Sequence, residues 1–178
     1  MTREEYCSKV DEAIDNFQLK GKLLDYKPYG NGHINDTFLV RCEEENQVIR
    51  YILQRLNHEI FKNPVELMEN IEGVTGHLKK KILEQNGDTK RETLNVIATK
   101  DGKSLYQDSI GSYWRTFLFI EDARSYDFVE KAEDFYETGL AFGRFQNLLA
   151  DYPVEKLHVT IPNFHHTPSR LEALKKAI

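Results

Sequence analysis

The sequence predicts an α+β protein in which an antiparallel sheet with one long helix comes first and further helices follow. Two observations lead to this fold class. Runs rich in β-branched and aromatic residues, separated by short polar or glycine-containing turns, are confined to the part before residue 122. Beyond residue 127, apolar residues recur at helical spacing instead. We therefore expect a sheet domain over residues 1–121 and a helical part over residues 122–178.

The first 56 residues predict a helix and a three-stranded meander. Apolar side chains recur at helical spacing over residues 4–17, which indicates a short amphipathic helix. Strand-like runs follow at 23–29, 37–42 and 47–56, and turns rich in glycine, asparagine or glutamate separate them. Three successive strands joined by short turns form an antiparallel meander.

A long helix is predicted directly after the third strand. Asn63 suits the N-cap, Pro64 the first helical position, and Glu66 the position three residues after the cap. Asn86-Gly87 is a typical helix end. The face that we expect to be buried carries Met68, Ile71, Thr75, Leu78 and Ile82.

Three more strands are expected at 94–98, 104–106 and 113–121, the last being the most apolar run in the chain. The sequence Lys-Asp-Gly-Lys at 100–103 predicts a hairpin turn between the first two of them. A strand followed by a change to helical spacing marks the end of the sheet domain.

The helical part begins with a periodic stretch over residues 128–149 and ends with a helix that Thr167-Pro168 opens. Gly139 and Gly143 lie four residues apart within the first helix. Each costs roughly 1 kcal/mol relative to alanine in a helix. We therefore expect close packing against another element at these two positions.

Composition excludes several classes of function. The net charge of −5 disfavours nucleic acid as the main partner, because binding phosphate needs a basic surface. Cys7 and Cys42 are far apart and form no Cys-x-x-Cys pair, which favours reduced thiols in the cytoplasm over a disulfide framework. The N-terminus has no signal-peptide core, and no apolar run is long enough for a bilayer. We expect a cytoplasmic protein with no membrane partner.

Four stretches, in this order, resemble a known family: residues 29–37 (YGNGHINDT), 51–57 (YILQRLN), 61–71 (FKNP to MENI) and 161–168 (IPNFH to TP). The chain is similar to the aminoglycoside phosphotransferase and choline kinase superfamily, and most of all to bacterial N-acetylhexosamine 1-kinases. The resemblance covers nearly the whole chain. It implies a protein-kinase-like N-lobe, a hinge and the first helices of a C-lobe, and therefore the N-terminal portion of an ATP-dependent small-molecule kinase.

The resemblance assigns a phosphate-covering loop to the turn after the first strand. Small residues let backbone N–H groups approach a polyphosphate, which suits Gly30, Asn31 and Gly32. An ordinary Asn-Gly hairpin is the alternative. The remaining candidates of this turn are Asn35 or Thr37 as side-chain donors to ATP, and His33 and Asp36 as contacts of the sugar substrate.

In kinases of this shape a cation on the third strand binds the nucleotide phosphates and a glutamate of the next helix. The strand YILQRL has no lysine. Arg55 is the candidate, with Gln54 as the alternative inward residue and a surface arginine as the plain interpretation. Glu69 is the candidate partner. Glu66 and Glu72 are alternatives, and all three suit a solvated helix equally well.

The end of the most apolar strand fits the hinge, where the backbone would bind the adenine edge. Phe119, Ile120 and Glu121 are the candidates, and a central core strand is a compatible interpretation. His158, His165 and His166 match no zinc spacing. We predict no metal site for this chain.

The catalytic loop of the superfamily is missing. No His-x-Asp occurs in the 178 residues, so the general base and the Mg²⁺ ligands are expected elsewhere in a longer protein, and no catalytic residue is assigned. We expect an inactive fragment that binds nucleotide and, through uncovered apolar surface, self-associates.

A non-catalytic binding module is the alternative function. An N-acetylhexosamine hydroxyl is the expected acceptor, with choline, aminoglycoside or homoserine as alternatives, and a generic α+β domain is the remaining possibility.

Overall fold

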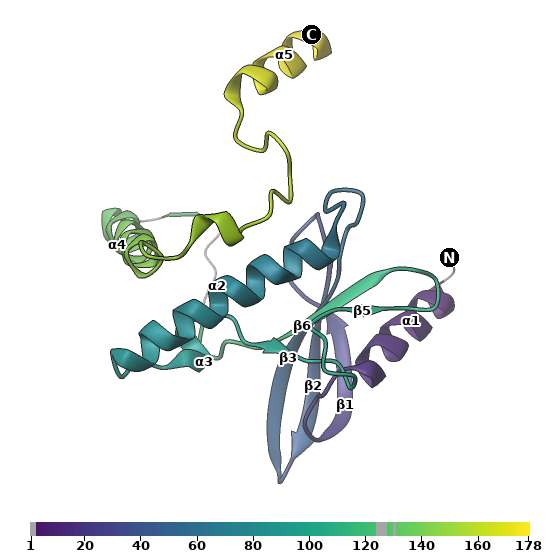
Figure 1. Cartoon of the computed structure of the whole chain (residues 1–178). Helices are drawn as coiled ribbons and strands as arrows, with labels where there is room; N and C mark the ends of the chain where they lie inside the picture. The colour runs from purple at the N-terminus through teal and green to yellow at the C-terminus, as the bar shows by residue number, and fades with distance from the viewer. Residues whose placement is uncertain (1–2, 124–127, 130) are drawn as a thin grey trace.

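The structure is a computed structural model that describes residues 3–123, 128–129 and 131–178. It confirms the α+β class, with one antiparallel sheet followed by helices (Figure 1). The elements are α1 (Arg3–Asn16), β1 (Lys22–Pro28), β2 (Asp36–Glu44), β3 (Gln47–Arg55), α2 (Pro64–Glu84), α3 (Thr89–Glu92), β4 (Val96–Ile97), β5 (Tyr106–Gln107), β6 (Tyr113–Leu118), α4 (Ala132–Leu148), a 3-10 turn η1 (Val154–Lys156) and α5 (Thr167–Ala177).

The sheet has the strand order β1-β2-β3-β6-β4, and β5 adds to β6 outside this path. All pairs are antiparallel. The β2–β3 hairpin closes through Glu45 and Asn46, which both have positive φ angles of 50° and 63°. Positive φ angles at both central residues are typical of a type I′ turn, whose twist matches that of the two strands it connects. The order leaves β3 and β6 in the centre of the sheet.

The main core lies between α1 and one face of the sheet. The expected stripe of α1 is confirmed: Val10, Ala13, Ile14 and Phe17 are all buried. They pack on alternate residues of the strands, which place every second side chain on the same face. The sheet side of this core consists of Phe38, Val40, Cys42, Tyr51, Leu53 and Trp114.

The predicted ends of α2 are confirmed. The Asn63 side chain accepts a hydrogen bond from the Glu66 N–H at 3.3 Å, and Pro64 occupies the first turn. At the other end Asn86 has φ 57°, and the Gly87 N–H donates to the Ile82 carbonyl at 2.8 Å. This is a Schellman-type stop. The helix therefore begins and ends where its sequence signals predict.

The expected hairpin between the strands at 94–98 and 104–106 is wrong. The turn itself forms, because the Gly102 N–H donates to the Thr99 carbonyl at 2.9 Å. However, β5 pairs with β6 and not with β4. The cause is Asp108, whose carboxylate accepts from the Ser112 N–H and from the Trp114 indole, both at 2.8 Å, and so closes a tight β5–β6 connection.

The expected packing at Gly139 and Gly143 is also wrong. A side chain added at either glycine of α4 would meet no described atom within 4 Å. Leu148 is the buried residue of this helix, whereas Phe135 and Phe142 are 69% and 65% exposed.

The last helix, α5, stands apart from the sheet in Figure 1. None of the described helices is both long and apolar enough to cross a membrane.

A first prediction concerns Thr116, which is fully buried in the centre of β6 and whose hydroxyl has no hydrogen-bond partner in the described part of the chain. Thr116→Val replaces an unpaired hydroxyl by a methyl group of the same shape. We expect the free energy of unfolding in urea to rise by about 1 kcal/mol. Thr116→Ser keeps the hydroxyl and loses a methyl group, so it should lower this free energy by about 1 kcal/mol. A destabilised valine variant would show that the hydroxyl is satisfied.

A second prediction concerns the pH dependence of the α1 contact with the β5–β6 connection. The Glu12 carboxylate accepts from Lys9, from the Ser109 N–H and hydroxyl, and from the Tyr106 hydroxyl. The Lys9 bond, aided by the Ser109 and Tyr106 donors, lowers the pKa of Glu12 from 4.5 to about 2.

A lowered pKa in the folded state means that the ionised carboxylate stabilises the fold above pH 4.5, and that this contribution disappears as the pH falls towards 2. We therefore expect Glu12→Gln to be less stable than the parent in urea at pH 7, and this difference to shrink below pH 4.5 and to vanish only below pH 2. A difference that stays constant over this whole range would contradict the assignment.

Candidate functional site

The two central strands send alternate side chains to opposite faces of the sheet. On β3, Tyr51 and Leu53 lie in the α1 core, whereas Ile52 and Gln54 lie on the side of α2. On β6, Trp114 belongs to the α1 core and Arg115 to the opposite side. This alternation decides which polar groups reach the space under α2.

A cleft of about 340 Å³, here called the central cleft, lies on the α2 side of the sheet. Its lining comes from the β1 end, the two central strands, α2, the segment before β4 and the segment after β6. These residues are Tyr29, Ile52, Gln54, Ile71, Leu94, Arg115, Phe117, Leu118, Phe119, Ile120 and Ala123. Ile71, Leu94 and Ile120 also line an adjoining apolar chamber of about 440 Å³ that extends to Phe145. Most of the cleft wall is therefore apolar, and the polar groups are concentrated at Gln54 and Arg115.

The candidate hinge residues divide between two environments. Phe119 and Ile120 line the central cleft, and the Phe119 ring lies 5.7 Å from that of Tyr29 and 4.3 Å from the Arg50 guanidinium. Glu121 lies outside the cleft lining, because its carboxylate binds the Arg50 Nε at 2.9 Å. Two of the three predicted residues are thus at the cleft.

The glycine turn stands open beside the cleft. Gly30 has φ +79°, and neither Gly30 nor Gly32 has a described atom within 4 Å of where a Cβ would be. The Tyr29 N–H donates to the Thr37 carbonyl at 2.9 Å and so closes the base of the turn. Asn31 is exposed with its neighbours. The turn therefore has both the exposure and the small residues that a phosphate-covering loop needs.

The polar residues after the turn point to different partners. The Asn35 Oδ1 accepts from the Asn57 N–H at 3.0 Å, which ties the end of the turn to the end of β3. The Thr37 hydroxyl accepts from the Gln54 amide at 3.1 Å. Thr37 is thus connected to the central cleft, while Asn35 has a structural bond.

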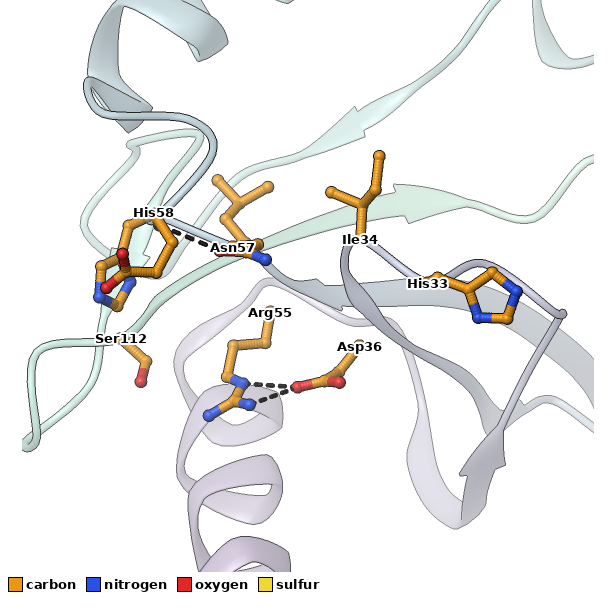
Figure 2. Close-up of a pocket in the computed structure, with 9 residues that line it drawn as sticks. His33, Ile34, Asp36, Arg55, Asn57, His58 and Ser112 are labelled. Atoms are coloured by element: carbon orange, nitrogen blue, oxygen red, sulfur yellow. Dashed lines mark hydrogen bonds and ion pairs between the residues drawn. The ribbon is translucent and has the colours of Figure 1, made fainter. Parts of the chain in front are cut away.

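Arg55 lies on the face opposite the central cleft. Its Nε and Nη2 atoms bind the Asp36 Oδ2 at 2.7 and 2.5 Å, and its guanidinium lies 5.1 Å from the Tyr6 ring of α1 (Figure 2). Burial, followed by the Asp36 hydrogen bond and charge, raises the pKa of Tyr6. Tyr51, Leu53 and Arg55 point to the same face of β3, and α1 covers that face. Arg55 therefore lies on the α1 side of the sheet, where the Asp36 carboxylate balances its charge.

His33 and Asp36 line a second pocket, of about 350 Å³, together with Ile34, Arg55, Leu56, Asn57, His58, Glu59 and Ser112. Figure 2 shows Asp36 and Arg55 facing each other between His33 on the turn side and His58 with Ser112 on the other. The two predicted sugar contacts therefore share a pocket, although Asp36 is ion-paired. No group of three or more metal-binding side chains occurs within the described residues.

Glu69 contacts the segment after α4 and not a strand cation. Its Oε2 lies 2.7 Å from the His158 Nε2. Of the two alternatives on α2, Glu72 accepts from the Ser104 hydroxyl at 3.0 Å, and the Glu66 N–H forms part of the cap. The expected pair between Arg55 and a glutamate of α2 is therefore not formed in this structure.

Arg115 is the cleft residue that the sequence pattern does not predict. Its Nε donates to the Gln54 Oε1 at 3.0 Å, and its guanidinium lies 5.2 Å from the Phe117 ring. Burial lowers the pKa of Arg115 to about 10, because removal from water disfavours the charged form. Alternation along YWRTFL places Arg115 on the face opposite to that of Trp114, as the structure shows, but does not indicate that this face carries a cleft. In the sequence Arg115 lies within an apolar run that is typical of a core strand.

Residues 148–158, here called the strap, hold α2 from the helical side. The Asn70 side-chain amide donates to the His158 carbonyl at 2.9 Å and accepts from its N–H at 2.8 Å. Two turns further on, His77 lies 3.1 Å from the Asp151 carboxylate, which also binds Lys81 at 2.5 Å. Leu148 packs with Leu78 and Ile82 of α2. These contacts fix the helix that carries Ile71 over the central cleft.

No protein-family model matches the chain. The central cleft is therefore a candidate functional site because of its geometry and because of the sequence resemblance.

A third prediction tests the strap at Gly73, where an added Cβ would lie 2.3 Å from the Tyr152 hydroxyl oxygen. Gly76 on the same helix has no described atom within 4 Å of that position, so it is the matched control. Gly76→Ala should raise the free energy of unfolding by about 1 kcal/mol through helix propensity alone.

Gly73→Ala should lose this gain or reverse it, because Tyr152 must move. Combining Gly73→Ala with Tyr152→Phe removes the oxygen and should restore most of the gain. Urea unfolding of the parent and the three variants measures the effect, and equal stabilisation by the two single alanine substitutions would show that Tyr152 does not pack on α2.

Proposed function

We propose that this chain is the nucleotide-binding lobe of an ATP-dependent small-molecule kinase. The observation that carries the proposal is the central cleft, which lies between a glycine turn, the third strand and the segment after β6, under the one long helix that follows β3. A kinase N-lobe is expected to arrange these parts in the same way. The four sequence stretches that resemble N-acetylhexosamine 1-kinases support the same conclusion.

The cleft residues fit an adenine nucleotide by their chemistry. Ile52, Leu94, Phe117 and Ile120 provide apolar walls for the base, and the backbone of residues 119–120, which line the cleft, would provide an edge for its hydrogen bonds. The glycine turn would cover the phosphates, with Thr37 at its base. Mg²⁺ would enter with the nucleotide phosphates and neutralise their charge.

The acceptor is proposed to be a sugar hydroxyl, on the resemblance alone. His33 is the better candidate contact, because the Asp36 carboxylate is occupied by Arg55. The 178 residues contain no His-x-Asp motif, which favours nucleotide binding over phosphoryl transfer as the contribution of this chain. A non-catalytic nucleotide-binding module is the second candidate for the same reason.

The remaining partner assignments are proposals of the same kind. The exposed aromatic side chains of α4 favour self-association, since large apolar patches mark contact surfaces. The separated cysteines, of which Cys42 is buried, favour a cytoplasmic location.

A fourth prediction tests nucleotide binding by thermal shift with Mg-ATP. Binding to the folded state should raise the melting temperature progressively, with about 2.7 kcal/mol of stabilisation at a hundred times Kd. Leu94 is 42% exposed and lines the cleft, so Leu94→Trp should fill the space and remove the shift. Leu83 is exposed on α2 outside the cleft lining, and Leu83→Trp should keep the full shift. A parent protein with no shift at millimolar Mg-ATP would contradict the proposal.

A further inference from the structure

The charge of Arg115 is not balanced within the described part of the chain. Arg41, Arg50, Arg55, Arg91 and Arg144 each lie within salt-bridge distance of a carboxylate. Arg115 has no such partner among the described residues, although it is the arginine whose pKa burial lowers. Arg170 also has none there, but it is exposed and binds the Phe164 carbonyl. A partly desolvated guanidinium without a carboxylate partner costs free energy unless something offsets it.

The position of Arg115 is set by a chain of side chains that crosses three strands. The Gln54 amide donates to the Thr37 hydroxyl on β2, which directs the Gln54 carbonyl oxygen to the Arg115 Nε on β6. A guanidinium has five N–H donors in a fixed fork. The Gln54 bond uses one of them, and no further hydrogen bond of the guanidinium occurs among the described residues. The Gln54 side chain, which is itself hydrogen-bonded to Thr37, therefore keeps the remaining N–H donors of Arg115 at the cleft.

We propose that Arg115 binds the phosphate groups of the ligand in the central cleft, the role that the sequence suggested for Arg55. A fork of N–H donors matches phosphate oxygens bidentately. The inference rests on the proposed nucleotide function for the identity of the ligand. The anion site itself follows from the unpaired guanidinium at the cleft.

The spacing along the strand agrees with a nucleotide. Arg115 precedes Phe119 by four residues in extended backbone, a distance of about 13 Å. The Phe119 N–H still pairs with the Arg50 carbonyl at 3.0 Å, so the backbone keeps its direction to that point. A base bound at 119–120 would therefore extend its ribose and phosphates towards Arg115 and the glycine turn.

The test compares ATP, adenosine and inorganic tripolyphosphate by calorimetric titration of the whole chain. Arg115→Met removes the charge at nearly constant length. It should weaken ATP binding roughly 10- to 100-fold, which is the loss of a hydrogen-bonded charged contact. Adenosine binding should stay within about twofold, because adenosine lacks phosphate. Tripolyphosphate binding should disappear. Arg115→Lys keeps the charge without the fork and should lie between the two.

Two further readouts separate a ligand role from a structural one. Without ligand, Arg115→Met should unfold at the same urea concentration as the parent or a higher one, because a partly buried charge without a carboxylate partner has been removed. Arg55→Met is the control on the opposite face. It should lower stability and leave the ratio of ATP to adenosine affinity unchanged.

The outcomes distinguish the two proposals. A parent that binds tripolyphosphate through Arg115 and binds neither ATP nor adenosine would refute the nucleotide function and keep the anion site. A parent that binds ATP and adenosine equally, with no change in Arg115→Met, would overturn the inference and keep a base-binding cleft. Lower stability of unliganded Arg115→Met with unchanged ATP affinity would show a structural arginine and overturn the inference as well.

Discussion

The pairing of β3 with β6 determines which side chains meet under α2. Register brings Gln54 opposite Arg115 and Leu53 opposite Thr116. Because successive residues alternate between faces, burying Leu53 and Trp114 against α1 forces their neighbours Gln54 and Arg115 to the cleft side. A slip of one residue would exchange the two sets. The buried α1 core thus fixes the composition of the cleft, although no residue of α1 lines it.

The second constraint is the attachment of α2 to the strap. α2 contributes Ile71 to the cleft wall, and its own buried contacts with Leu148 and its polar bonds to His158 and Asp151 come from the helical part of the chain. Glu69 belongs to this attachment. A glutamate that anchors the helix to the strap is not available to a cation on β3. α2 therefore contacts both the cleft and the strap, so the strap helps to set the position of the cleft wall.

The sequence predicted the elements better than the partners of its side chains. Caps and periodicity are local, so α1, the β1–β3 meander and the two ends of α2 were predictable. The pairing of β5 depended on Asp108, whose bonds to Ser112 and Trp114 are visible only in three dimensions. Arg55 and Gln54 were both candidates because alternation gives two faces without saying which one a helix covers. Arg115 was missed because an arginine within an apolar strand carries no local sign of its environment.

The two arginines on neighbouring central strands lie in opposite environments. Arg55 is ion-paired with Asp36 and lies against the Tyr6 ring, so its charge helps to hold α1 to the end of β3. Arg115 keeps most of its donors and its full charge in a largely apolar cleft, which lowers the stability of the free chain. An anion that binds there removes this cost, so ligand binding and folding stability are coupled through one side chain. A charge that no carboxylate of the described residues balances, in a cleft beside a glycine turn, is better explained by a ligand than by packing.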